Sequence, residues 1–222
     1  MQAQDAQPVA AVDSVQTIKH GLRLGVDISK PLRAVLDDDY TGITLTADYR
    51  LTSKIYISAE VGREELSRDT PSLTYTSSGT YFLAGADYNF YTNWAGEDNM
   101  LYGGFYVGYS SLEQTLDSFQ IATQSPILNP DRIEEPLTSE DLSLVYVHLR
   151  LGFKYEVLPN FYMGLHVGVS RSVSETVPDE YANLYAPGFG RTYDFSKFGV
   201  GYGYVLSYRI PLYKSTRSIS KD

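Results

Sequence analysis

The chain has 222 residues, a formal net charge of −9 and no cysteine, with 20 tyrosines, 9 phenylalanines and 18 glycines. Without cysteine it has no disulfides, zinc–thiolate sites or thiol catalysis, and the acidic balance argues against nucleic acid as a partner. The length fits one domain, the mean hydropathy is −0.23, and no apolar run reaches the roughly 18 residues that a membrane helix needs.

Period-2 alternation of apolar and polar residues recurs eight times and predicts eight β-strands. In the sixth segment, for example, Val147, Leu149 and Leu151 alternate with His148 and Arg150. Most segments match the ~9–11 residues with which a tilted strand crosses a membrane. In chain order the predicted strands cover residues 21–29, 40–50, 55–64, 75–90, 100–112, 147–156, 161–172 and 197–213.

The predicted connections alternate in length. The longer ones cover residues 30–39, 65–74, 113–141 and 174–196, and the shorter ones cover 51–54, 91–99 and 157–160. Short periplasmic turns and longer outer loops are typical of outer-membrane barrels. An even number of strands places both termini at the end with the short turns.

The strand face that carries the charged residues is also rich in glycine, which favours a membrane barrel over a soluble one. A soluble, lipocalin-like barrel turns its polar face to water, where glycines would only weaken the strands. A narrow interior needs small residues beside bulky ones. If Leu158–Asn160 forms a tight turn, Arg150 pairs with Gly168 and Lys154 with Gly164.

Aromatic residues gather at the predicted short-turn ends, as expected at a membrane interface. We therefore expect an all-β, eight-stranded antiparallel up-and-down transmembrane β-barrel in the outer membrane of a Gram-negative bacterium. It would contact outer-membrane lipids and lipopolysaccharide. The alternative is a soluble β-sandwich with an aromatic core. The aromatic residues are Tyr49, Tyr88, Phe90, Trp94, Phe153, Tyr155, Phe161, Tyr208 and Tyr213.

The two ends of the chain, residues 1–19 and 214–222, are expected to be tails that flank the barrel at residues 20–213. The first residues show neither the basic segment nor the apolar segment of a signal peptide. An outer-membrane protein requires one, so we expect a sequence from which the signal peptide is already removed.

Charged residues of both signs are predicted to face the lumen. Because such charges are shielded from water, they should pair and hydrogen-bond with one another. We expect a polar plug rather than an ion path, since eight strands leave no open channel. The predicted plug residues are Arg23, Asp27, Asp48, Arg50, Glu60, Asp87, His148, Arg150, Lys154, Glu156, His166 and Arg209.

Four stretches of the sequence resemble an uncharacterised family of Bacteroidota outer-membrane barrels: Gly21–Arg33, Asp38–Gly42, Asn183–Phe189 and Ser196–Tyr204. The likeness spans most of residues 20–213. It implies a barrel fold and an outer-membrane location, and it transfers no catalytic residue because the family has no agreed activity. Many barrels end on an aromatic residue, whereas nine residues follow Tyr213 here.

The fourth long connection offers a candidate binding loop, with aromatic residues around a Pro-Gly turn. Tyrosine, phenylalanine and arginine are frequent in binding hot spots, but the loop could equally pack onto the barrel mouth as a cap. The third long connection, residues 113–141, is long enough to be functional or mobile. The candidate binding residues are Asn183, Tyr185, Pro187, Gly188, Phe189 and Arg191.

No catalytic, cofactor or metal motif stands out. His148 and His166 are predicted to face inward in mid-strand, two positions apart, without a nucleophile in reach. The acidic run Asp37–Asp39 lacks the spacing of a calcium loop and is expected to be solvated or to bridge lipopolysaccharide phosphates. We expect a non-enzymatic accessory protein that docks a larger outer-membrane complex. The alternative is a small-ligand or lipid binder with a loop-formed pocket above the plug.

Overall fold

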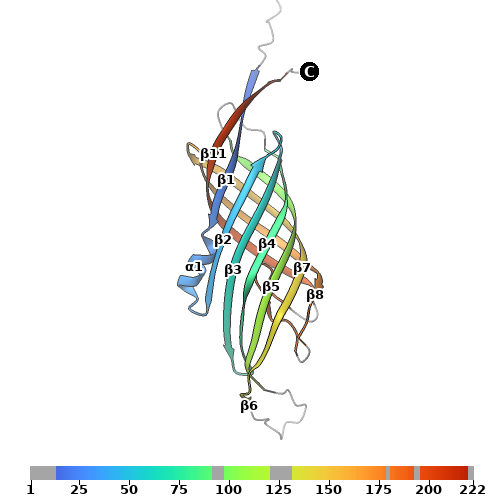
Figure 1. Cartoon of the computed structure of the whole chain (residues 1–222). Coiled ribbons are helices and arrows are strands. Elements are labelled where there is room, and N and C mark those ends of the chain that lie inside the picture. Colours follow the sequence, from blue (N-terminus) through green and yellow to red (C-terminus); the bar gives the residue numbers. More distant parts are fainter. Residues whose placement is uncertain (1–13, 92–97, 121–131, 179–180, 193–195, 220–222) are drawn as a thin grey trace, which may run out of the picture.

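The computed structural model describes residues 14–91, 98–120, 132–178, 181–192 and 196–219. Eight long strands each pair antiparallel with the next, and the last pairs with the first, so the sheet closes into an up-and-down barrel (Figure 1). The predicted fold class is confirmed. The strands are β1 (Ser14–Asp27), β2 (Tyr40–Arg50), β3 (Ile55–Thr70), β4 (Leu73–Asn89), β5 (Met100–Gln120), β7 (Leu137–Leu158), β8 (Phe161–Glu175) and β11 (Phe198–Ile219).

Three two-residue strands complete the pairing. β6 (Arg132–Ile133) extends the sheet beside β5, and β9 (Tyr185–Ala186) pairs with β10 (Gly190–Arg191) in the connection between β8 and β11. The start of β1 and the end of β11 lie at the same end of the barrel as the connections at 51–54 and 159–160 (Figure 1), hereafter the short-turn end; the opposite end is the loop end. No helix in the described part of the chain is long and apolar enough to span a membrane.

Several strands are longer than the sequence predicts. The expected connection at 65–74 is wrong, because β3 and β4 continue to a turn at Pro71 and Ser72, and β5 and β7 likewise extend into the expected connection at 113–141. Near the loop end the outward residues Glu65 and Ser78 are polar, so the apolar–polar contrast fades although pairing persists. Residues 121–131 of that connection lie outside the described residues.

The expected tails are also shorter than predicted, because β1 begins at Ser14 and β11 ends at Ile219, and these two residues pair with each other. Their pairing carries a two-stranded ribbon beyond the short-turn end (Figure 1). Residues 1–13 and 220–222 lie outside the described residues.

A helix, α1 (Ser29–Leu36), occupies most of the connection that the sequence predicts as a loop at 30–39. The carboxylate of Asp27 accepts a hydrogen bond from the backbone N–H of Ser29 at 2.9 Å, which satisfies one of the free donors of the first turn. Pro31 stands in that first turn, where the missing N–H costs no helical hydrogen bond. The helix lies beside β2 at the side of the barrel (Figure 1).

The predicted register of β7 and β8 is confirmed: Arg150 pairs with Gly168, and Lys154 pairs with Gly164. The turn between them consists of Pro159 and Asn160, and Asn160 has a φ of 68°. Proline fixes the first turn position and asparagine tolerates the left-handed second one. A local turn therefore sets which side chains meet inside the barrel.

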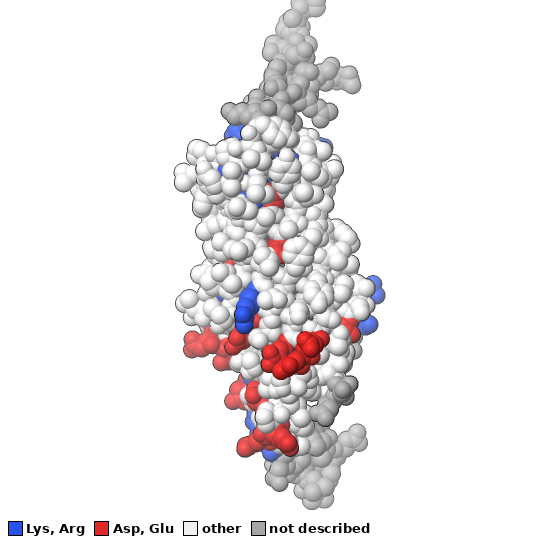
Figure 2. Space-filling model, in the orientation of Figure 1, with Lys and Arg blue, Asp and Glu red and all other residues white. Residues whose placement is uncertain are grey.

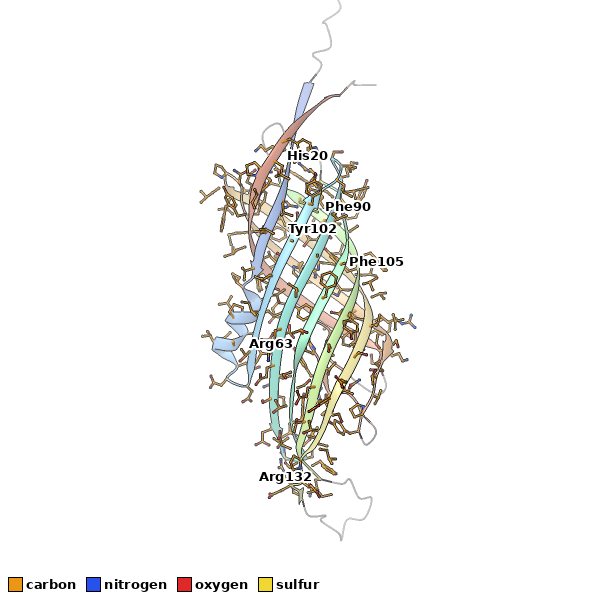
Figure 3. The ribbon with its side chains drawn as sticks, viewed as in Figure 1. His20, Arg63, Phe90, Tyr102, Phe105 and Arg132 are labelled. Atoms are coloured by element: carbon orange, nitrogen blue, oxygen red, sulfur yellow. The ribbon has the colours of Figure 1, made fainter. Side chains whose placement is uncertain are left out.

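The outer wall is apolar across a central band and acidic near the loop end. Phe105 projects from the wall and is 54% exposed, whereas its neighbour Tyr102 is buried inside (Figure 3). Figure 2 shows acidic side chains gathered below a band with few charges. An apolar outer band with an inward polar face is the arrangement of a membrane barrel. Of the predicted aromatic girdle, Trp94 lies outside the described residues.

Candidate functional site

The lumen near the short-turn end holds a network of ion pairs, hereafter the lumen network. Asp48 lies at its centre and accepts from two cations: Arg23 Nε at 2.5 Å and Lys154 Nζ at 2.6 Å. The guanidinium of Arg23 also stacks over the rings of Tyr56 and Tyr162, at 4.7 and 5.1 Å. Each buried charge thus has a counter-charge or an aromatic face, which offsets its loss of hydration.

A second group crosses the barrel farther toward the loop end. Arg150 forms a two-pronged ion pair with Glu60, with Nη2 3.0 Å from Oε2. His148 shares a hydrogen bond with Ser170 at 2.8 Å, and its ring fills the space over Gly168. A Cβ added to Gly168 would lie 2.4 Å from that ring. The predicted opposition of large and small residues is what lets these side chains fit.

Asp98 also belongs to the lumen network, although the sequence predicts that it lies in the connection at 91–99. It pairs with Arg50 at 2.9 Å and with Arg209, and it accepts from the Tyr162 hydroxyl at 3.1 Å. Arg209 also reaches Glu156 at 3.2 Å. No alternation pattern covers Asp98, so the sequence gives no signal that it faces the lumen.

The remaining predicted plug residues also point inward. Asp87 accepts hydrogen bonds from Ser58, at 2.7 Å, and from Tyr106, and Asp27 holds the start of α1 and the N–H of Tyr204. His166 packs over Gly203. Eleven of the twelve predicted residues are buried, and Glu156 is partly exposed.

The connection between β8 and β11 folds into the barrel mouth. Asn183, Tyr185, Pro187 and Phe189 are buried, whereas Gly188 is half-buried and Arg191 is exposed. This is the position expected for a cap rather than for an exposed recognition loop. We call residues 181–192 the cap.

Hydrogen bonds from distant strands hold the cap. Tyr185 donates its hydroxyl to Glu64 on β3, and Ser77 on β4 donates to the Tyr185 carbonyl at 2.8 Å. The side chain of Gln114 on β5 accepts from the backbone N–H of Leu184 at 2.9 Å. Glu64 is not among the predicted plug residues, although it continues the inward alternation of Glu60 and Gly62 along β3.

Apolar side chains from the strands surround the cap and fill the loop half of the lumen. Phe189 packs edge-on against Tyr146, with ring centroids 5.5 Å apart. The lumen therefore has two layers: ion pairs toward the short-turn end and an apolar core toward the loop end. The two apolar clusters comprise Tyr81, Leu83, Tyr106, Leu112, Leu142, Leu144, Tyr146, Ala186 and Phe189, and Tyr40, Leu66, Tyr75, Leu116 and Tyr185.

The acidic run after α1 is partly paired rather than only solvated. Asp37 lies 2.6 Å from Arg68 on β3 and 3.5 Å from Arg33, and Asp39 lies 3.5 Å from Arg68. The hydrogen bond from Arg68 lowers the pKa of Asp37 to about 2. Among the described residues, no cluster of three or more histidine or acidic side chains could hold a metal ion.

These features define a closed transmembrane β-barrel with a filled interior. The chain belongs to a family described as a domain of unknown function (DUF6048), whose model matches residues 1–215. The resemblance to an uncharacterised barrel family is thereby confirmed, while an origin in the Bacteroidota stays a prediction. No curated protein matches the chain.

Solved structures with a similar fold include three bacterial proteins. Ail, the attachment invasion locus protein of Yersinia pestis, is 8% identical over 86% of this chain and 99% of its own, with a TM-score of 0.45. CarO2 of Acinetobacter baumannii is 14% identical over 88% and 100%, with a TM-score of 0.43. Neisserial surface protein A is 10% identical over 89% and 100%, with a TM-score of 0.41.

Proposed function

We propose that this protein is a non-enzymatic accessory component of the Gram-negative outer membrane that docks a larger protein complex through its outer surfaces. One observation carries the proposal: the described lumen is filled in both halves, by the lumen network and by the cap. A lumen filled in this way has no continuous path through the barrel for an ion or a substrate. What remains for function is the outer wall and the loop end.

The loop end supplies a charged surface for such docking. Glu65, Glu113 and Glu140 are exposed on the strand extensions. Figure 2 shows acidic side chains gathered toward this end of the barrel. A partner with a basic face would be steered to this surface. Divalent cations could also bridge it to lipopolysaccharide phosphates, and outer-membrane lipids would contact the apolar band.

Affinity purification after gentle detergent extraction from the native membrane tests the docking role. We expect a stoichiometric partner with the unaltered protein and its loss after Glu65→Lys combined with Glu113→Lys, which reverses the surface charge. The matched control is Thr52→Lys combined with Ser53→Lys, which adds the same lysines at the short-turn end. A protein recovered alone, carrying lipid or a small molecule, would contradict docking.

A second candidate function, a small-ligand or lipid binder with a loop-formed pocket above the plugged lumen, is favoured by one specific observation. The cap leaves a cavity of about 110 Å³ between itself, α1 and β11. Binding of a ligand there would survive the loss of every docking partner, so the two candidates separate experimentally.

A further inference from the structure

The barrel wall is incomplete beside α1. β1 ends at Asp27, opposite Val205 of β11, and it pairs with β2 only over Leu22–Val26. Residues 198–203 of β11 and 40–44 of β2 therefore have no β1 residue between them. The helix contacts both strands and lies over this gap (Figure 1).

The cavity of about 110 Å³ lies at this gap. Its walls include Lys30 and Arg33 from α1, Glu64 from β3, Phe189 from the cap and Gly201 from β11. Gly201 follows the inward alternation of β11, yet a Cβ added to it would meet no described atom within 4 Å beyond its chain neighbours. At each other glycine of the described strands an added Cβ would lie within 4 Å of another residue, so the space at Gly201 is left unfilled.

The hydrogen-bond donors and acceptors that line the cavity favour a negatively charged ligand. The charge of Glu64 is balanced by Lys30, whose Nζ lies 2.6 Å from Oε1, and Oε2 accepts from the Tyr185 hydroxyl and the Gly188 N–H. Lys30 has three N–H donors and Arg33 has five. In the described chain the ion pair of Lys30 is with Glu64, and that of Arg33 is with Asp37 at 3.5 Å. The two cations thus have more donors than these partners use, and the one carboxylate that lines the cavity is already paired with a cation.

The ammonium group of Lys30 is held at the cavity by its ion pair with Glu64. The Arg33 guanidinium stacks on the Tyr40 ring at 3.8 Å, which fixes its plane and leaves its N–H edges free to donate. Two cationic side chains, those of Lys30 and Arg33, therefore line the cavity.

An apolar groove runs from the other side of α1 along the outer wall. It encloses about 490 Å³ between Leu32 of α1 and wall residues that include Phe153, Met163 and Leu206. The outer side of the helix is also apolar, with Val35 80% exposed. Such surfaces belong in contact with lipid chains.

We propose that the gap beneath α1 binds an anionic amphiphile of the membrane. Its carboxylate or phosphate head takes the free donors of Lys30 and Arg33 in the cavity, and its chain lies in the groove beside Leu32. This inference rests on the second proposed function, not on docking. It names the ligand class and the place of binding.

A single introduced thiol provides the readout, because the natural sequence has no cysteine. Gly201→Cys fits the open space, and Val61→Cys on the outer wall is the control, since Val61 is exposed on β3 and lines neither the cavity nor the groove. In a non-ionic detergent, palmitate and a short-chain phosphatidic acid should slow maleimide labelling of the first thiol and not of the second. Native mass spectrometry should show one bound molecule for each protein.

Substitutions of the residues proposed to bind the head group should show whether binding requires their charge while the fold is kept. Arg33→Gln should weaken protection about tenfold, as expected for a lost charge-assisted hydrogen bond. Lys30→Gln combined with Glu64→Gln should do the same without leaving a buried charge unpaired. Glu113→Gln, on the loop-end surface, should change nothing.

Three outcomes would overturn the proposal. Equal protection by inorganic phosphate alone would make the cavity a site for a free anion rather than for a lipid. Equal protection by a neutral amphiphile, such as a monoacylglycerol, would keep ligand binding but remove the anionic requirement. Absence of any bound molecule would reject the ligand-binding function itself.

Discussion

At the scale of single residues, the lumen replaces part of a hydrophobic core with paired charges. Glu60 and Arg150 come from strands 90 residues apart in sequence and form a bidentate pair. Pairing offsets much of the desolvation of both groups, but removing one partner leaves the other as an isolated buried charge. Removing one residue of the pair should therefore lower the free energy of unfolding more than replacing both residues together.

Glu60→Gln should lower the free energy of unfolding by about 3–5 kcal/mol, because it leaves Arg150 buried without a counter-charge. Glu60→Leu combined with Arg150→Met should cost less than the single change. Urea unfolding of the barrel in lipid vesicles measures both. Glu65→Gln, on the water-facing side of the same strand, is the control and should have little effect; an equal loss there would contradict the lumen pairing.

The sequence predicts the residues of the lumen well where alternation is continuous. Arg150, Gly168, Lys154 and Gly164 meet as predicted because a two-residue turn fixes their register. Asp98 was missed because it belongs to no strand. Its contacts with Arg50 and Arg209 exist only once the barrel has closed.

At the scale of elements, α1 covers the part of the barrel wall where β1 has already ended. Residues 30–39 were predicted to be a connection because they lie between two alternating segments, and an eight-residue helix gives little helical periodicity. The start of the helix depends on Asp27, and its end is held by Asp37 through Arg68. Both anchors are charged groups whose partners are set by the sheet rather than by the helix.

Acid should loosen the end of α1. Because the pKa of Asp37 falls from 3.8 to about 2 in the folded protein, its contribution to stability is fully present above about pH 4 and is lost as the pH falls toward 2. Amide chemical shifts of α1 in micelles, followed from pH 6 to pH 2, should report this change. Asp37→Asn should abolish it and Asp38→Asn should not; an unaltered titration in Asp37→Asn would contradict the assignment.

The cap illustrates a second limit of sequence reasoning. The aromatic Pro-Gly segment suits both an exposed loop and a buried one, and its own residues do not decide between them. The decision comes from Glu64, Ser77 and Gln114, which lie 70 to 121 residues away from their partners in the cap. Such long-range polar contacts leave no local pattern.

At the scale of the whole molecule, closure of the barrel depends on whether inward side chains fit across it. A Cβ added to Gly108 would lie 2.3 Å from the ring of Tyr146, which is fully buried, whereas Gly201 faces open space. Both glycines lie on the inward face of the barrel. Substituting each of them in turn therefore separates the effect of crowding at the position from the effect of losing a glycine.

Gly108→Leu should therefore prevent closure, whereas Gly201→Leu should be tolerated. A closed barrel migrates differently on a denaturing gel before and after boiling, and its circular dichroism in detergent is β-rich. We expect the boiling-dependent shift for the unaltered protein and for Gly201→Leu, and its loss for Gly108→Leu. A folded protein that stays monomeric in water without detergent would contradict the membrane assignment.

The pairing of β1 with β11 has a consequence for how the protein is made. Short turns join β2 to β3, β3 to β4 and β7 to β8, but Ser14 and Ile219 meet across almost the entire chain. Such a contact has the highest possible sequence separation and is slow to form. The first strand must therefore wait, with one edge open, until ribosomal synthesis and export have delivered the last one. A truncation that removes β11 would leave that edge exposed, and an exposed strand edge invites aggregation.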